Sequence, residues 1–554
     1  MGKFLRKYQY LVLLALIVFV SFFPIVGIFI TPKLLHTHDG FAHLARIAAY
    51  YKALQDFEFP VRWAGDLNYG YGMPIFNFMY QTPYFIASLF LFTHMSLVNA
   101  FKVTLGLSYI LSGIFMYGFA KEAFNDNKKA FLVAIFYQFA PFRLIELLVR
   151  GAFGEVYTYA FLPLVLWGIA KFVKKQSFTS FLLISIATAL LVLSHNALSL
   201  VFFGICFVYT FLFAQNKNTF FKTMIALCFG LLLSAYYWVP AIIEHKYTYG
   251  DLFMKTLYLH YFPPLQNFFI PNLINSTSFQ TGGISVQIGL FHVIAIIFSL
   301  FLLFRKNTET FIKKLTVANI ILLLITFFFM QPISIPIWEH VALLRQFQFA
   351  WRLLGIVTFI TSILSVSYLY FKIFTKQWVY ILLVVLTIIT TAYYWKPPLG
   401  YDAINEKYYW NFPLTSTYFG ETDVIWSAGP AKAYPQSRIE FVAGNGKITK
   451  FIKRQTTQTF TVKTNNKAVL VSNTEYFPGW RVFVNGEPVS IQFQDPNWRG
   501  LITFAVPKGT STVQIAFGET PLRLSSDIAS LTGIILLIFL GILRKKIFYE
   551  RKKV

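Results

Sequence analysis

Long apolar blocks are the feature that most restricts the fold of this 554-residue chain. A segment of about twenty apolar residues matches the ~30 Å hydrocarbon core of a bilayer at ~1.5 Å per residue. Such segments predict twelve transmembrane helices, at residues 9–30, 98–120, 129–148, 156–173, 178–195, 197–214, 222–240, 286–304, 315–331, 352–371, 378–395 and 526–543. With 56% hydrophobic and only 13% charged residues, the composition excludes a water-soluble protein and a disordered chain.

The charge pattern predicts how these helices are oriented. The chain carries 48 Lys and Arg against 23 Asp and Glu, and most basic clusters lie at the ends of apolar blocks, in alternate connections. By the positive-inside rule these connections face the cytoplasm, so both termini are expected there. The protein is therefore expected to be a multi-pass protein of the cytoplasmic membrane that binds no nucleic acid. The short apolar run 83–95 is expected to lie on the membrane surface.

The same orientation places four stretches outside: 31–97, 241–285, 332–351 and 396–525. In the last of these, apolar and polar residues alternate with the period of a half-buried strand, as in RIEFVA, KAVLVSN, WRVFV, VSIQFQ, LITFAV and TVQIAF. Asn485-Gly486 is a strong hairpin signal. We expect a transmembrane domain over 1–395, an extracytoplasmic antiparallel β-sandwich over 396–525, and a last helix with a basic cytoplasmic tail over 526–554.

The first outer stretch contains HTHDGFAHLARI, which predicts a helix from Asp39 to about Phe57 because Asp is a favoured N-cap residue. At ~100° per residue, His43 and Arg46 share one face with Asp39, so the helix is expected to lie on the bilayer with a polar stripe facing a cavity. These groups have the parts to deprotonate a hydroxyl beside an anionic substrate. Asp39 could equally be a solvated cap. His38, Asp39 and His43 could also hold a divalent cation, although their spacing is a weak metal signal.

A second group of ionisable residues lies in FAPFRLIELLVRGAFGE, at the outer end of the third predicted span. Arg143 and Glu146 are three residues apart and could form an intrahelical ion pair. Arg150 and Glu155 flank a glycine-containing turn, where the planar fork of an arginine could bind phosphate. Structural and functional interpretations remain equally open here.

Further polar residues near the outer face suit either buried structural roles or a sugar and phosphate groove. They are His195 and Asn196 after the fifth predicted span, Glu244 after the seventh, and Gln346, Gln348 and Arg352 before the tenth.

Taken together, several segments resemble the bacterial YfhO-like and "6-pyruvoyl-tetrahydropterin synthase-related" membrane proteins, a group similar to the GT-C superfamily of membrane glycosyltransferases. The matching segments are HDGFAHLARI, FPVRWAGDLNYGYGMPIFNFMY, APFRLIELLVRGAFGE, LSHN, YYWVPAIIE, QFQFAWR, YFPGWRVFVNGEPV and GETPLR. The resemblance covers nearly the whole chain. Despite the family label, nothing in the sequence resembles a soluble pterin enzyme.

The resemblance implies a GT-C-like fold and transfer of a sugar from a polyprenyl-phosphate carrier to an envelope polymer, lipid or protein outside the membrane. It implies that Asp39 is the catalytic base or a metal partner and that Glu155 is the second acidic site. The paired acids of some GT-C members are missing, because His38 and Gly40 flank Asp39. A metal, if present, would bind Asp39 and His43. The residues expected to bind substrate are His38, His43, Arg46, Arg62, Arg143, Arg150, His195, Asn196, Glu244, Gln348 and Arg352.

Two other functions remain open at this stage. A transporter or flippase of a lipid-linked or anionic substrate would also use arginines near the membrane, but the chain shows no internal repeat. A non-catalytic envelope scaffold would explain the helices and the sandwich, but not the Asp39 and Arg150 groups.

Overall fold

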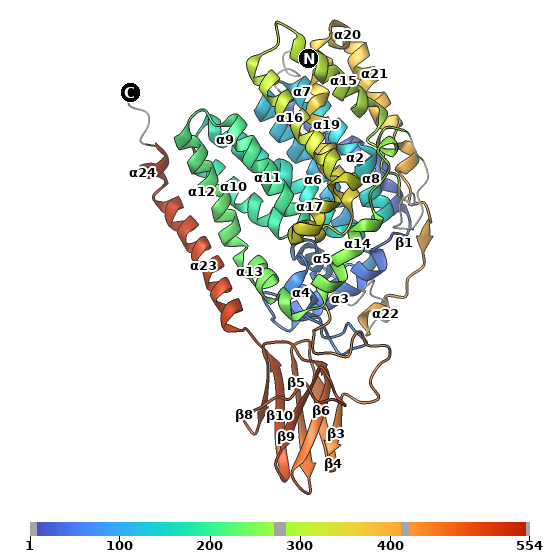
Figure 1. Cartoon of the computed structure of the whole chain (residues 1–554), viewed down its shortest axis with the longest axis vertical. Helices are drawn as coiled ribbons and strands as arrows, with labels where there is room; N and C mark the ends of the chain where they lie inside the picture. The colour runs from blue at the N-terminus through green and yellow to red at the C-terminus, as the bar shows by residue number, and fades with distance from the viewer. Residues whose placement is uncertain (1–7, 271–283, 412–421, 550–554) are drawn as a thin grey trace.

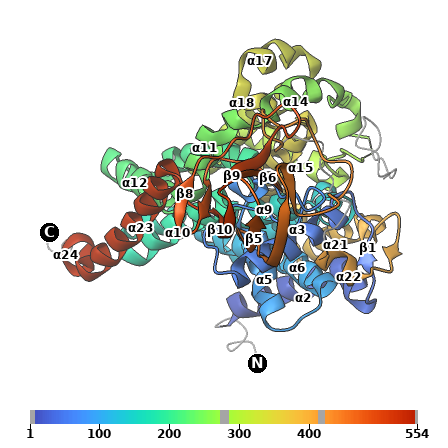
Figure 2. The same cartoon turned by 90° about the horizontal axis from the view of Figure 1, so that it is seen from below.

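The computed structural model describes residues 8–270, 284–411 and 422–549. Figure 1 shows a helical body with β-sheets projecting from one end. Helix α23 (Pro521–Ile542) leaves the sheets and runs back along the helical body, so that its end and the following α24 (Arg544–Tyr549) lie far from the sheets. Seen from the sheet end, the strands stand over one part of the helical body and α23 lies to one side (Figure 2).

Eight helices in the described residues are long and apolar enough to cross a membrane. They are α2 (Gln9–Ile30), α6 (Leu97–Phe124), α9 (Phe153–Lys174), α11 (Asn196–Phe213), α16 (Thr310–Phe329), the run Ala350–Tyr370 with α19 (Leu354–Leu364) at its centre, Gln377–Tyr394 with α21 (Gln377–Ile389), and α23.

Two further spans are bent pairs of helices, which raise the number of candidate spans to at most ten. One pair is α7 (Asn127–Gln138) with Pro141–Arg150, bent by 51°, and the other is α12 (Lys217–Leu233) with Ala235–Tyr247, bent by 71°. The first bend falls at Pro141, which disfavours helical geometry in the residue before it.

All twelve predicted segments coincide with helices, but two of these helices are short. Helices α10 (Phe178–Val192) and α15 (Leu290–Phe304) have 15 residues each. The number of twelve spans therefore stays a prediction. The predicted surface run forms α5 (Thr82–Phe92), an 11-residue helix that contacts α6.

The connections contain shorter helices. They are α3 (Gly40–Gln55), α4 (Ile75–Phe78), α8 (Pro141–Leu144), α13 (Ala235–Ile243), α14 (Gly250–Leu257), α17 (Ile335–His340), α18 (Ala342–Arg345), α20 (Lys372–Thr375), α22 (Glu406–Trp410), the π-helical turn η1 (Ile145–Arg150), and the 3₁₀ turns η2 (Glu244–Tyr247), η3 (Tyr258–His260), η4 (Leu265–Phe268), η5 (Pro332–Ser334), η6 (Ala350–Leu353), η7 (Ser365–Tyr370) and η8 (Ala392–Tyr394).

Helix α3 confirms the predicted helix but not its predicted position on the bilayer surface. It packs against α5, α6 and α22, and most of its residues are buried. Alanines at positions 42, 45, 48 and 49 let neighbouring helices approach it closely, so an apparently amphipathic helix is enclosed on nearly every side. His43 and Arg46 are therefore buried in the protein interior, whereas Gln55 at the end of the helix is exposed.

The C-terminal sheets pack around one shared apolar core that includes Phe460, Leu470, Val482 and Phe504. A five-stranded sheet has the order β4-β5-β10-β7-β8, and a three-stranded sheet has the order β3-β6-β9. The strands are β3 (Ile439–Ala443), β4 (Gly446–Lys453), β5 (Thr457–Thr464), β6 (Ala468–Glu475), β7 (Trp480–Val484), β8 (Glu487–Val489), β9 (Leu501–Val506) and β10 (Gly509–Phe517). The neighbouring strands of both sheets pair antiparallel.

The predicted hairpin at Asn485-Gly486 is confirmed, since both residues have positive φ angles of 53° and 89°. The predicted strand VSIQFQ is wrong beyond Val489: only Gln492 makes an isolated bridge there, to Thr503. Strands β4 and β5 were not predicted. Strand β4 lies at a sheet edge with most residues exposed, so it lacks the alternation that identifies a half-buried strand.

The segment after residue 396 first contacts the helical body. Strand β2 (Tyr401–Asp402) pairs with β1 (Leu34–Leu35), and α22 packs on α3. The limits 396–525 for a separate outer domain stay a prediction.

Candidate functional site

A buried cluster of charged side chains joins chain segments that are far apart in the sequence. Arg150 Nη1 lies 2.6 Å from Glu146 Oε2 and 2.8 Å from Glu155 Oε1. Arg352 Nε lies 2.9 Å from the same oxygen of Glu155. His195 Nε2 lies 4.0 Å from it. We call Arg150, Glu155, Arg352, His195 and Asp39 the outer cluster.

The local backbone explains how Arg150 and Glu155 meet. Arg150 ends the π-helical turn η1, and Gly151 follows with φ +63°, a conformation that glycine adopts without strain. Glu155 then lies in the first turn of α9. A Cβ atom on Gly151 would approach Thr37 Oγ1 to 2.5 Å, so the small residue also lets the first outer stretch pack closely here.

Backbone hydrogen bonds hold Asp39 against this turn. The amide of His38 donates to Val149 O at 3.1 Å and the amide of Asp39 donates to Arg150 O at 3.0 Å. Asp39 precedes α3, but its side chain makes no capping hydrogen bond; Thr37 Oγ1 accepts from the Gly40 amide instead. The interpretation of Asp39 as a simple side-chain cap is therefore wrong.

Asp39 is half-buried and lies in the field of the neighbouring arginines. Burial raises the pKa of its carboxyl above the ordinary value of 3.8, and the charges of Arg150 and Arg46 oppose that rise. Arg46, whose side chain is buried, lies about two turns further along α3 than Asp39. A carboxylate with a raised pKa beside arginines can accept a proton while an anion is bound nearby.

His43 lies one turn after Asp39 on the same helix. Its Nδ1 is 2.9 Å from the Tyr84 hydroxyl, and its ring packs on Phe101 and Phe153. Burial and the charge of Arg46 lower the pKa of His43 well below 6.5, so its imidazole is neutral. His43 therefore acts as a hydrogen-bonding group here.

Gln348 adjoins the outer cluster through Arg352. Gln348 Oε1 accepts from Arg352 Nη1 at 3.2 Å, and Phe347 O accepts from the same nitrogen at 2.8 Å. His195 stacks on Tyr80 with ring centroids 5.6 Å apart. Asn196 makes different contacts: its Nδ2 donates to Phe78 O at 2.7 Å and its Oδ1 accepts from the Tyr237 hydroxyl.

Arg143 does not form the predicted ion pair with Glu146 in the described residues. Glu146 pairs with Arg150, four residues later, a spacing that places both side chains on the same face of a helix. Arg143 Nη2 instead donates to Ser112 Oγ at 2.7 Å, and its guanidinium faces the rings of Tyr159, Tyr137 and Tyr109 at 4.6, 5.2 and 5.9 Å.

Several buried polar atoms in and beside the outer cluster have no hydrogen-bond partner among the described residues. They include Arg150 Nε, Glu155 Oε2, Arg143 Nε, Arg143 Nη1 and Tyr159 Oη. More than ~90% of buried polar groups in native proteins are partnered, and exceptions often mark a site for a ligand or water. These atoms therefore identify this region as the candidate site.

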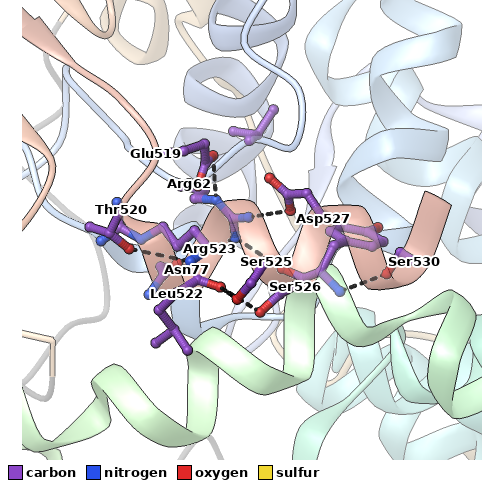
Figure 3. Close-up of polar contacts among 12 residues, drawn as sticks. Arg62, Asn77, Glu519, Thr520, Leu522, Arg523, Ser525, Ser526, Asp527 and Ser530 are labelled. Atoms are coloured by element: carbon purple, nitrogen blue, oxygen red, sulfur yellow. Dashed lines mark hydrogen bonds and ion pairs between the residues drawn. The ribbon is translucent and has the colours of Figure 1, made fainter. Parts of the chain in front are cut away.

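Arg62 and Glu244 belong to a separate network at the start of α23. Arg62 Nε lies 2.8 Å from Glu519 Oε1, and its Nη2 lies 2.8 Å from Asp527 Oδ1, as Figure 3 shows. Glu244 Oε2 accepts from Arg523 Nε at 2.9 Å and from Asn77 Nδ2 at 2.7 Å. This network joins the first outer stretch to the last helix, so both predicted substrate-binding residues have structural partners here.

The described residues contain no group of three or more His, Cys, Asp and Glu side chains that could hold a metal ion. Asp39 and His43 are fewer than the three or four protein ligands of a zinc site, and His43 Nδ1 is engaged with Tyr84.

Comparison with known proteins identifies the family. The model of a family described as "6-pyruvoyl-tetrahydropterin synthase related domain; membrane protein" matches residues 76–397. The chain belongs to this membrane protein family. The chain is also 24% identical to an uncharacterized protein of Lactococcus lactis subsp. cremoris (strain MG1363) over 223 residues. This match covers 38% of this chain and 36% of the Lactococcus protein.

Among solved structures, the chain is similar to two structures of the arabinofuranosyltransferase AftD from mycobacteria. One of these two structures is of a mutant AftD. The sequence identity is 13% in both cases, the TM-scores are 0.44 and 0.42, and the matches cover 74% and 72% of this chain. The chain spans 28% of AftD and little more than a third of the Lactococcus protein.

Sequence reasoning missed two aromatic residues of the candidate site. Tyr84 contacts His43, and the ring of Trp351 lies 4.9 Å from the Arg150 guanidinium. Trp351 directly precedes Arg352 in QFQFAWR, so the motif itself contained the signal. Tyr84 lies in an apolar run with no distinguishing feature.

Proposed function

We propose that this chain is a GT-C-type membrane glycosyltransferase, which transfers a sugar from a polyprenyl-phosphate carrier to an envelope acceptor on the outer face of the membrane. One arrangement carries the proposal. The backbone amide of Asp39 is hydrogen-bonded to the carbonyl of Arg150, and the side chains of Arg150 and Arg352 both contact the carboxylate of Glu155. This combines a proton acceptor with two planar, phosphate-binding forks.

The arrangement of the helices supports an outward-facing site. The turns rich in Lys and Arg, such as the one between α6 and α7, lie at the end of the helical body away from the sheets (Figure 1). By the positive-inside rule that end faces the cytoplasm, and the outer cluster and the sheets then face outward.

The reaction is a single displacement at the anomeric carbon of the sugar. The acceptor oxygen forms a bond to this carbon as the bond to the carrier phosphate breaks, and the phosphate leaves with the bonding electrons. Asp39 takes the proton of the acceptor hydroxyl. Arg150, Arg352 and Arg46 stabilise the negative charge on the leaving phosphate in a site shielded from water.

Glu155 has a positioning role in this mechanism. Its Oε1 lies within 2.9 Å of two arginines, so it stays a carboxylate that holds both guanidinium groups in place. It is a weaker base than Asp39 for the same reason.

Purified protein in liposomes tests the proposal when it is given polyprenyl-phosphate sugars. Carrier consumption together with sugar transfer supports the glycosyltransferase. Passage of intact carrier across the bilayer would instead support the flippase.

A further inference from the structure

Arg143 is a buried cation that the outer cluster leaves incompletely paired. Arg143 is 1% exposed, and its Nη2 donates a hydrogen bond to Ser112 Oγ. Its Nε and Nη1 have no hydrogen-bond partner among the described residues. Three tyrosine rings offset part of the cost of burying this charge, but not the loss of two hydrogen bonds.

Arg150 shows the opposite imbalance. Its Nη1 faces three acceptor oxygens: Glu146 Oε1 at 2.7 Å, Glu146 Oε2 at 2.6 Å and Glu155 Oε1 at 2.8 Å. A guanidinium NH₂ group carries two hydrogens, so it cannot serve three acceptors well. Glu146 is thus the excess acceptor on Arg150. Arg143, three residues before Glu146, has two N–H groups, Nε and Nη1, without a partner among the described residues.

Tyr159 is close to Arg143 and within electrostatic range of Glu146 and Arg150. Its ring is 4.6 Å from the Arg143 guanidinium, and the charges of Glu146 and Arg150 also act on its hydroxyl. That hydroxyl has no hydrogen-bond partner among the described residues. A carboxylate that turned from Arg150 toward Arg143 would meet two kinds of unused donor.

We infer that Glu146 exchanges partners when a phosphate enters the site: it leaves Arg150, which then binds the phosphate, and pairs with Arg143 and the Tyr159 hydroxyl. Arg143 is then a positioning residue that acts through Glu146 and never touches the substrate. The inference rests on the proposed function in one respect, that Arg150 binds the carrier phosphate.

Binding of polyprenyl phosphate to the full chain in nanodiscs tests this exchange without requiring transfer. Arg143→Gln should weaken binding about ten-fold, because Glu146 then stays on Arg150. Glu146→Gln should bind at least as tightly as wild type, because Arg150 is released. In the Glu146→Gln background, Arg143→Gln should change the affinity less than about two-fold.

Two further variants separate exchange from a purely structural role. Arg143→Lys keeps a cation for Glu146 and should restore binding to within about three-fold of wild type. Ser112→Ala removes the hydrogen bond of Arg143 in the empty site and should leave the affinity for polyprenyl phosphate unchanged. Thermal unfolding checks that each variant is folded.

The exchange would be overturned if Arg143→Gln lowered the affinity for polyprenyl phosphate equally in the wild-type and Glu146→Gln backgrounds. It would also be overturned if Glu146→Gln alone bound polyprenyl phosphate more weakly than wild type. Failure of wild type to bind polyprenyl phosphate would overturn both this inference and the proposed function. Normal binding and exchange without sugar transfer would contradict only the proposed function.

Discussion

Arg352 Nε lies 2.9 Å from Glu155 Oε1, the oxygen that also receives Arg150. The contact joins the start of α9 to the turn before α19, nearly two hundred residues later. Loss of the carboxylate charge would leave two buried guanidinium groups to repel each other.

Glu155→Gln should therefore lower sugar transfer by about 10- to 100-fold while the protein stays folded. The loss should lie mainly in the affinity for the polyprenyl-phosphate donor, because both phosphate-binding groups lose their common anchor. Steady-state kinetics with varied donor measures this. A variant with an unchanged KM for the donor would show that Glu155 does not position these arginines.

The pH dependence of transfer reports on Asp39. Because its pKa is raised above 3.8, transfer should fall on acidification at a higher pH than an ordinary aspartate would dictate. Arg46→Gln removes a charge that opposes this rise, so the acidic limb of the pH–rate profile should move to still higher pH. His43→Gln, which changes no charge, is the matched control. A limb that stays in place in Arg46→Gln would contradict the role of Asp39 as base.

Two buried carboxyl groups predict a pH-dependent contact between the sheets and the first outer stretch. Burial, and then the neighbouring Asp423, raise the pKa of Glu475 well above 4.5, and the Glu475 amide donates to Tyr71 O at 2.9 Å. A raised carboxyl pKa means that the folded state binds the proton more tightly than the unfolded state. Its stabilisation is complete below pH ~4.5 and is lost as the pH rises through the folded pKa.

Hydrogen exchange at the Glu475 amide should therefore accelerate as the pH rises, beyond the intrinsic increase. Glu475→Gln removes the titrating charge and should abolish this extra acceleration, whereas Glu487→Gln, at an exposed position in β8, should not. Identical pH profiles in wild type and Glu475→Gln would contradict the prediction.

Arg62 anchors the last helix to the first outer stretch. Arg62→Gln should destabilise the protein by about 3 kcal/mol, because it leaves Asp527 and Glu519 without their buried partner. Thermal unfolding in detergent measures the loss. Arg481→Gln is the control, since Arg481 is exposed and its Nη2 donates a 3.3 Å hydrogen bond to the backbone carbonyl of Glu519. Polyprenyl-phosphate binding should survive in both variants.

Much of the fold could be predicted from local patterns in the sequence. Apolar length located every predicted helical segment, and Asn485-Gly486 located its hairpin, because each feature depends on neighbouring residues. The enclosure of α3 could not be predicted in this way. Its burial depends on α22, which lies more than three hundred residues later in the chain.

The candidate site shows the same division. Asp39, Arg150, Glu155 and Arg352 could be proposed individually, because charges next to apolar spans are costly and so stand out. Their common position could not, and neither could the pairing of Arg62 with Glu519 and Asp527, which is fixed by tertiary packing. The unused donors of Arg143 could not be predicted either, because they follow from the pairing of Glu146 with Arg150 in the folded structure.

The most direct test of the account compares wild type and Asp39→Asn in nanodiscs supplied with a polyprenyl-phosphate sugar and an acceptor. Asp39→Asn keeps the size of the side chain and removes its basicity. The account predicts that transfer falls about 100-fold or more while donor binding and thermal unfolding stay near wild type. Asp495→Asn, in a loop of the β-sheet region, should transfer normally. Full transfer by a folded Asp39→Asn protein would contradict the central claim.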